Sequence, residues 1–129
     1  MFIQIFMKNK KIFFFVNHAA FFVSHRLNLA LEAKRKGMIV EVLIGNPSTQ
    51  KEEKIAQDIL RKKKIKIVKF PFSSSSLNVF NSLYCLIKIY KYLTKNTPDI
   101  IHLISPKGIL LGGLSSVMAN IDSLIISIS

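Results

Sequence analysis

Residues 17–26 bring an amide, two imidazoles, a hydroxyl and a guanidinium into one short stretch of the chain. They follow residues 11–16, an apolar run whose length predicts a fully buried strand. Ligands of open α/β sheets bind outside the carboxyl ends of the strands, so these groups would border a crevice. Ser24 opens a helical pattern, and its hydroxyl together with the free backbone N–H groups of a first helical turn favours anions. The candidate cleft residues in this stretch are Asn17, His18, Ser24, His25 and Arg26.

Further polar side chains are expected at the same edge of the sheet. Ser105 and Lys107 follow a predicted strand, Ser129 lies at the end of the last one, and residues 73–76 are consecutive serines. Hydroxyl and ammonium groups can bind phosphate or sugar hydroxyls. We therefore add Ser105, Lys107 and Ser129 to the candidate substrate-binding residues, and we assign no catalytic residue.

The three histidines do not predict a metal site. His18, His25 and His102 lack the spacing of metal ligands and have no cysteine or acidic companions. His102 stands between two apolar residues of a predicted strand, which favours a satisfied core residue. Two interpretations of His25 stay open: it either adds to the capping pattern of the helix or faces the crevice beside Arg26.

Several common classes of α/β protein are excluded by what the sequence lacks. Residues 17–24, the turn after the first strand, contain no glycine, whereas a dinucleotide site needs glycines there so that the backbone can approach the pyrophosphate. The chain has no Gly-Lys-Ser/Thr of a P-loop and no Gly-x-Ser-x-Gly of a hydrolase elbow. Acidic residues, which a phosphoacceptor domain would place after the first strand, are also missing there.

The net charge of +12 requires either a partner or a compositional explanation. Lys88, Lys91 and Lys95 share one face of a predicted helix, and residues 62–64 are three more lysines. An anionic membrane surface or a phosphate-bearing ligand would be attracted to them. Alternatively, the charge reflects a lysine-rich composition whose side chains are simply solvated and have no partner. Nucleic acid is the weakest candidate partner, because no aromatic platform accompanies the charge.

Strand-like and helix-like patterns alternate along the chain. The predicted strands cover residues 11–16, 38–44, 65–70, 100–104 and 123–129, and the predicted helices cover residues 24–36, 51–63, 79–95 and 107–119. This alternation predicts an α/β fold, a Rossmann-like doubly wound parallel sheet of about five strands in the order 3-2-1-4-5 with helices on both faces. Ser24 is expected to cap the first helix and Gly37 to end it.

Apolar spacing predicts which helical positions are buried. The helix over residues 51–63 should be the most exposed element, because its apolar stripe is narrow. The helix over residues 79–95 should bury a stripe of Leu83, Ile87, Tyr90 and Leu93. The single cysteine, Cys85, excludes an intramolecular disulfide, fits a reducing compartment and reads as a buried thiol. A cytoplasmic domain is expected, and peripheral association with the inner face of the membrane stays open.

Residues 21–30, 36–40, 98–107 and 112–114 resemble the N-terminal domain of family 4 glycosyltransferases. The resemblance covers residues 11–129, which leaves residues 1–10 as an N-terminal extension. It implies one half of a GT-B architecture, in which two Rossmann-like domains face each other across a cleft. It further implies that this half holds the acceptor, and that the other half binds a nucleotide-sugar donor for a retaining transfer without a metal.

By the same resemblance, the loop around Ser24 and His25 would lie near the donor phosphates, and residues 105–113 would line the acceptor side. The chain ends within the predicted fifth strand, so the expectation is a truncated or split enzyme that is inactive alone and needs a separate domain for its donor. The acceptor would be a glycan or a lipid-linked glycan of envelope polysaccharide synthesis. The alternative is a non-catalytic, basic module that binds a membrane surface or a protein partner.

Overall fold

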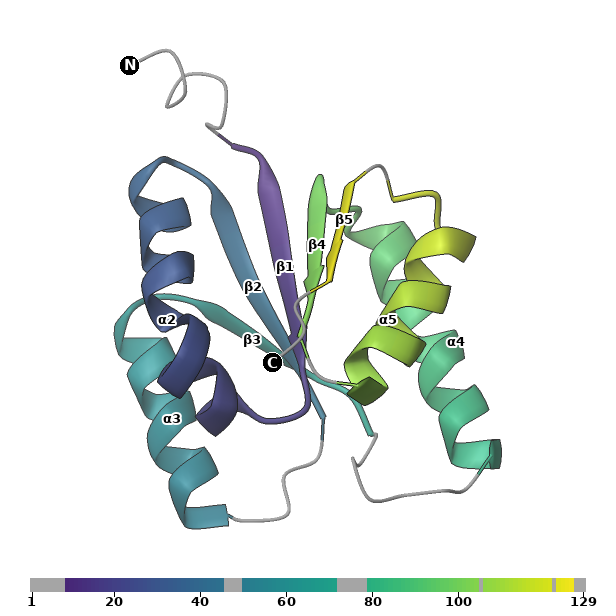
Figure 1. Cartoon of the computed structure of the whole chain (residues 1–129), viewed down its shortest axis with the longest axis horizontal. Helices are drawn as coiled ribbons and strands as arrows, with labels where there is room; N and C mark the ends of the chain where they lie inside the picture. The colour runs from purple at the N-terminus through teal and green to yellow at the C-terminus, as the bar shows by residue number, and fades with distance from the viewer. Residues whose placement is uncertain (1–8, 46–49, 72–78, 105, 122, 127–129) are drawn as a thin grey trace.

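A computed structural model describes residues 9–45, 50–71, 79–104, 106–121 and 123–126 (Figure 1). Within this part of the chain, five strands alternate with four helices. The strands are β1 (Lys11–Val16), β2 (Ile39–Ile44), β3 (Lys66–Lys69), β4 (Ile100–Leu103) and β5 (Ser123–Ile126). The helices are α2 (Ala19–Arg35), α3 (Gln50–Lys62), α4 (Val79–Lys95) and α5 (Pro106–Met118).

The five strands form one sheet in the order β3-β2-β1-β4-β5, and every pairing is parallel. This confirms the predicted fold class and strand order. Helices α2 and α3 cover one face of the sheet, and α4 and α5 cover the other (Figure 1). Strand β3 lies at an edge, which agrees with the alternation of lysines and apolar residues in it.

Central strand β1 supplies side chains to two hydrophobic cores. Phe14 and Val16 pack with α2 and α3, whereas Phe13 and Phe15 pack with α4 and α5. All four side chains are completely buried. A strand covered on both faces needs an uninterrupted apolar sequence, and this explains the apolar run over residues 12–16.

The first helix begins earlier than predicted. Helix α2 starts at Ala19 with His18 at the N-cap position, so the expectation that Ser24 caps this helix was wrong. The apolar residues 19–23 look like a continuation of the strand in the sequence, but they form the first turns of the helix. Ala19 and Phe22 are completely buried there, and this burial stabilises the earlier start. The predicted end is confirmed, since Gly37 follows the last turn with a φ of 91°, a conformation that glycine adopts without strain.

The apolar stripe predicted for α4 was also wrong. The helix buries Cys85, Ile89 and Leu93, whereas Leu83 and Ile87 are 53% and 45% exposed. Only Leu93 belongs to both the predicted and the observed stripe. Because the helix is rotated about its axis relative to the prediction, its apolar surface is shared between the core and solvent. The prediction that Cys85 is buried is confirmed.

Glu53 of α3 joins the two helices on its face of the sheet. Its oxygens accept hydrogen bonds from the backbone N–H groups of Ala19 at 2.7 Å and Ala20 at 2.9 Å. These are unpaired donors of the first turn of α2, which no residue within the helix can satisfy. The side chain is 1% exposed and lies in the first turn of α3, so the positive ends of two helix dipoles favour its charge.

A second buried carboxylate lies on the opposite side of the sheet. Glu41 of β2 is 7% exposed and accepts a hydrogen bond from the hydroxyl of Tyr92 in α4. Burial, followed by this bond, raises the pKa of Tyr92, so that the hydroxyl remains a donor at neutral pH. The two buried carboxylates therefore each connect a helix to another element by hydrogen bonds.

Gly112 allows α5 to approach the sheet closely. A Cβ atom at this position would lie 2.6 Å from Cδ2 of Leu103 and 3.3 Å from Cγ of Phe15, both of which are buried. At the neighbouring Gly113 the nearest atom would be 3.4 Å away, an ordinary contact. Close packing thus explains the glycine at position 112, the first of the two adjacent glycines in the segment that resembles family 4 glycosyltransferases.

We expect Glu53→Gln to lower the free energy of unfolding by about 1–3 kcal/mol, because the amide nitrogen of glutamine cannot accept one of the two N–H bonds. The control is Glu52→Gln, which removes the same charge from the same helical turn at an exposed position and should change stability by less than about 0.5 kcal/mol. Urea denaturation followed by circular dichroism measures both. Equal midpoints for the two variants would contradict the role of Glu53.

Alanine at the two adjacent glycines separates packing from helix propensity. Gly113→Ala should raise the free energy of unfolding by about 0.5–1 kcal/mol, since glycine is unfavourable within a helix. Gly112→Ala should be less stable than Gly113→Ala by about 1–3 kcal/mol, because the added methyl overpacks the contact with Leu103. Thermal unfolding of the two variants tests the order, and the reverse order would show that α5 can move away from the sheet at little cost.

Candidate functional site

The candidate site lies at the carboxyl edge of the sheet, where β1 and β2 end and α2 and α3 begin (lower part of Figure 1). The strand ends are held together by backbone bonds. The N–H of Gly45 donates to the carbonyl of Asn17 at 3.1 Å, and the N–H of Ile104 donates to that of Phe15 at 3.0 Å. These bonds fix the turn between β1 and α2, in which the first candidate residues lie.

Asn17 and His18 occupy this turn as half-buried side chains. The carbonyl of His18 accepts a 3.3 Å bond from the N–H of Phe22, and its side chain makes no capping bond. Its Nδ1 is buried and has no hydrogen-bond partner among the described residues. A buried ring nitrogen of this kind is costly unless something satisfies it, so His18 remains a candidate ligand-binding residue.

Ser24, His25 and Arg26 lie in the second turn of α2 and point in different directions. Ser24 is exposed and lies beside residues of α3, with which it lines a groove. His25 stacks on Phe21 with ring centroids 4.3 Å apart, and its Nδ1 lies 3.1 Å from the carbonyl oxygen of Phe21. Arg26 donates to the carbonyl of His25 at 3.1 Å. The helix therefore does not bring these three side chains together at one point.

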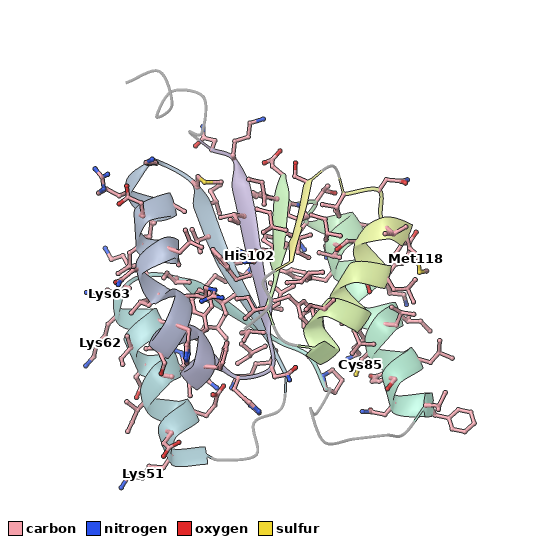
Figure 2. All side chains as sticks on the ribbon, viewed as in Figure 1. Lys51, Lys62, Lys63, Cys85, His102 and Met118 are labelled. Carbon is pink, nitrogen blue, oxygen red and sulfur yellow. The ribbon has the colours of Figure 1, made fainter. Side chains whose placement is uncertain are left out.

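His102 of β4 is a core residue, as predicted. It is 6% exposed, and its ring lies 5.3 Å from that of Phe14 (Figure 2). Burial, and then the charge of Arg26, hold the pKa of His102 below its ordinary value. The ring is consequently neutral at neutral pH and is held within the sheet.

Several predicted positions are outside what the structure describes. Ser105, Ser129 and residues 73–76 are not among the described residues. Lys107 is placed in the first turn of α5, but its side chain is not described. Their roles stay predictions.

A groove of 290 Å³ between α2 and α3 was not predicted from the sequence. Its lining combines apolar side chains with one hydroxyl and one carboxylate: Ala20, Val23, Ser24, Glu52, Ile55, Ala56 and Ile59. Local sequence patterns gave Ser24 but could not give its partner helix, since the groove forms only when two helices pack side by side. Polar groups between apolar walls are typical of small-molecule sites.

The first two backbone N–H groups of α2 are engaged within the protein. Those of Ala19 and Ala20 both donate to Glu53. Sequence reasoning missed this residue, and the only signal for it was an acidic pair in the first turn of a helix. Among the described residues, no group of three or more His, Cys, Asp or Glu side chains could hold a metal ion.

The candidate basic face lies on α4, on the other side of the sheet from the groove. Lys88, Lys91 and Lys95 are all exposed, and the ammonium of Lys88 lies 5.0 Å from the ring centre of Tyr84. The same helix exposes Phe80 at 84%, together with Leu83, Tyr84 and Ile87. No helix in the described part of the chain has both the length and the apolar content that crossing a bilayer requires.

Solved structures with this fold include several with different activities. The chain is similar to MurG from Acinetobacter baumannii, with a TM-score of 0.69 and 18% identity over 90% of this chain and 34% of that one. It is similar to a glycosyltransferase from Rickettsia africae ESF-5, with a TM-score of 0.65 and 17% identity over 93% of this chain and 30% of that one. The hydratase GalB from Pseudomonas putida KT2440 also matches, with a TM-score of 0.62 and 13% identity over 92% of this chain and 62% of that one. These similarities show the fold.

The chain spans about a third of the length of the first two of these proteins. No curated protein matches the sequence closely enough to count as a relative. The sequence profile described as glycosyl transferase 4-like matches residues 11–129, which include every strand and helix described above. The chain therefore belongs to the glycosyl transferase 4-like family.

Proposed function

We propose that this domain is the acceptor-side wall of a glycosyltransferase whose nucleotide-sugar donor is bound by a separate domain or chain. The observation that carries the proposal is the family match over residues 11–129. The proposed acceptor is a glycan or a lipid-linked glycan of envelope polysaccharide synthesis. In this proposal the domain is inactive without the domain or chain that binds the donor.

The requirement for a second wall follows from the chemistry of transfer. Holding two reactants in register can lower a barrier by roughly 7–11 kcal/mol. The candidate residues at the carboxyl edge offer hydroxyl, carboxylate and imidazole groups on separate elements, and the first two N–H groups of α2 are taken by Glu53. We expect acceptor hydroxyls to contact Ser24 and Glu52 in the groove, and His18 at the end of β1.

Complementation in trans tests the proposal. The purified chain, mixed with a separately produced donor-binding domain, should transfer sugar to a lipid-linked acceptor, and neither part should do so alone. Ser24→Arg fills the groove and should reduce transfer by roughly tenfold or more, about 1.4 kcal/mol. Asn28→Arg, an exposed change one turn further along α2, is the matched control and should leave transfer unchanged. No gain in the mixture over either part alone would reject the split enzyme.

A second candidate function is docking of α4 on an anionic membrane, and a specific observation favours it. The outward face of α4 carries exposed apolar side chains beside three exposed lysines, the combination typical of helices that lie in a membrane interface. Each lysine near an anionic surface contributes about 1 kcal/mol. This function is compatible with the first, because a lipid-linked acceptor is itself at the membrane.

Vesicle sedimentation distinguishes this second function. The chain should bind vesicles that contain phosphatidylserine, and the bound fraction should fall steeply with added salt. The double change Lys88→Glu with Lys91→Glu should abolish binding, whereas Lys51→Glu with Lys54→Glu, the same charge change on α3, should largely preserve it. Figure 2 shows Lys51 at the start of α3, remote from α4. Binding to neutral vesicles, or equal loss in both variants, would count against a docking face on α4.

A further inference from the structure

We infer that Glu53 is a specificity-determining residue that excludes phosphate from the N-terminus of α2. What this exclusion means for a glycosyltransferase rests on the proposed function. In that setting the turn after β1 does not bind the phosphates of the donor, and the ligand it admits is uncharged. This differs from what the family resemblance implies for the loop around Ser24 and His25.

The geometry leaves no room for a second anion. Both carboxylate oxygens of Glu53 are engaged, one with the N–H of Ala19 at 2.7 Å and the other with that of Ala20 at 2.9 Å. These donors are the groups that a helix N-terminus normally offers to a phosphate. The side chain is 1% exposed, so a ligand could reach the donors only by displacing a buried carboxylate.

The helix dipoles at this point are already compensated by Glu53. Glu53 lies in the first turn of α3, next to Glu52, which lines the groove beside Ala20. The attraction of both helix N-termini for negative charge is already satisfied by the protein's own carboxylate. Glu52, which lines the groove, can accept a hydrogen bond from a sugar hydroxyl. The exposed lysines Lys51 and Lys54 flank the two glutamates, so the exclusion comes from the occupied N–H groups and does not need a negative local net charge.

Titration with inorganic phosphate, followed by amide chemical shifts of the isotope-labelled chain, tests the inference. In the unchanged protein the amide resonances of Ala19 and Ala20 should not move with phosphate beyond their response to chloride at equal ionic strength. In Glu53→Gln, which keeps the size of the side chain and removes its charge, the same two resonances should shift saturably in the millimolar range. Glu52→Gln is the control and should behave like the unchanged protein at these two amides.

Either of two results would overturn the inference. One is a saturable shift of Ala19 and Ala20 in the unchanged protein. The other is a folded Glu53→Gln variant in which phosphate leaves both amides unmoved. If Glu53→Gln does not fold, Glu53→Ala replaces it, and the titration of the unchanged protein still decides the claim. The measurement needs no donor, acceptor or partner chain, so its failure is distinct from failure of the complementation experiment.

Discussion

The carboxylate of Glu53 between two helix N-termini is the interaction on which the candidate site depends. It fixes the start of α2 against α3, and these two helices form the groove that Ser24 and Glu52 line. It also determines the electrostatics of this edge of the sheet. A Rossmann-like turn usually leaves its first N–H groups to a ligand phosphate, but here the protein satisfies them itself. One side chain thus both stabilises the fold and restricts its chemistry.

The two-sided burial of β1 means that a site cannot lie on either face of this strand. Phe13 and Phe15 fill one core and Phe14 and Val16 fill the other, so neither face of the central strand is accessible. His102 illustrates the consequence, because this histidine within β4 is buried and packs against Phe14, and burial lowers its pKa. Polar chemistry is confined to residues beyond the strands, such as His18, and to helix faces that look away from the core.

The alternation of apolar runs and helical patterns was sufficient to predict the strand order, since short crossovers of one hand allow few arrangements. Local signals failed where long-range packing decides. The start of α2 depends on the burial of Ala19 and Phe22 and on a carboxylate 34 residues away, so the hydroxyl of Ser24 indicated the wrong residue. The rotation of α4 likewise depends on its contact with α5, which a helical pattern does not contain. The groove was missed for the same reason, because it belongs to a pair of helices.

The arrangement of the sheet separates the two candidate surfaces. Helices α2 and α3 lie on one face of the sheet and α4 lies on the other (Figure 1). The groove belongs to the first pair, and the exposed apolar and basic side chains belong to α4. A domain that docks through α4 would therefore keep its groove clear of the bilayer surface. Three exposed lysines, Lys88, Lys91 and Lys95, lie on α4. The α3 side carries both signs, since Glu52 lines the groove and the exposed Lys51 and Lys54 lie next to it. The net charge of +12 therefore does not describe the contact between α2 and α3, where a buried carboxylate occupies the first N–H groups of α2.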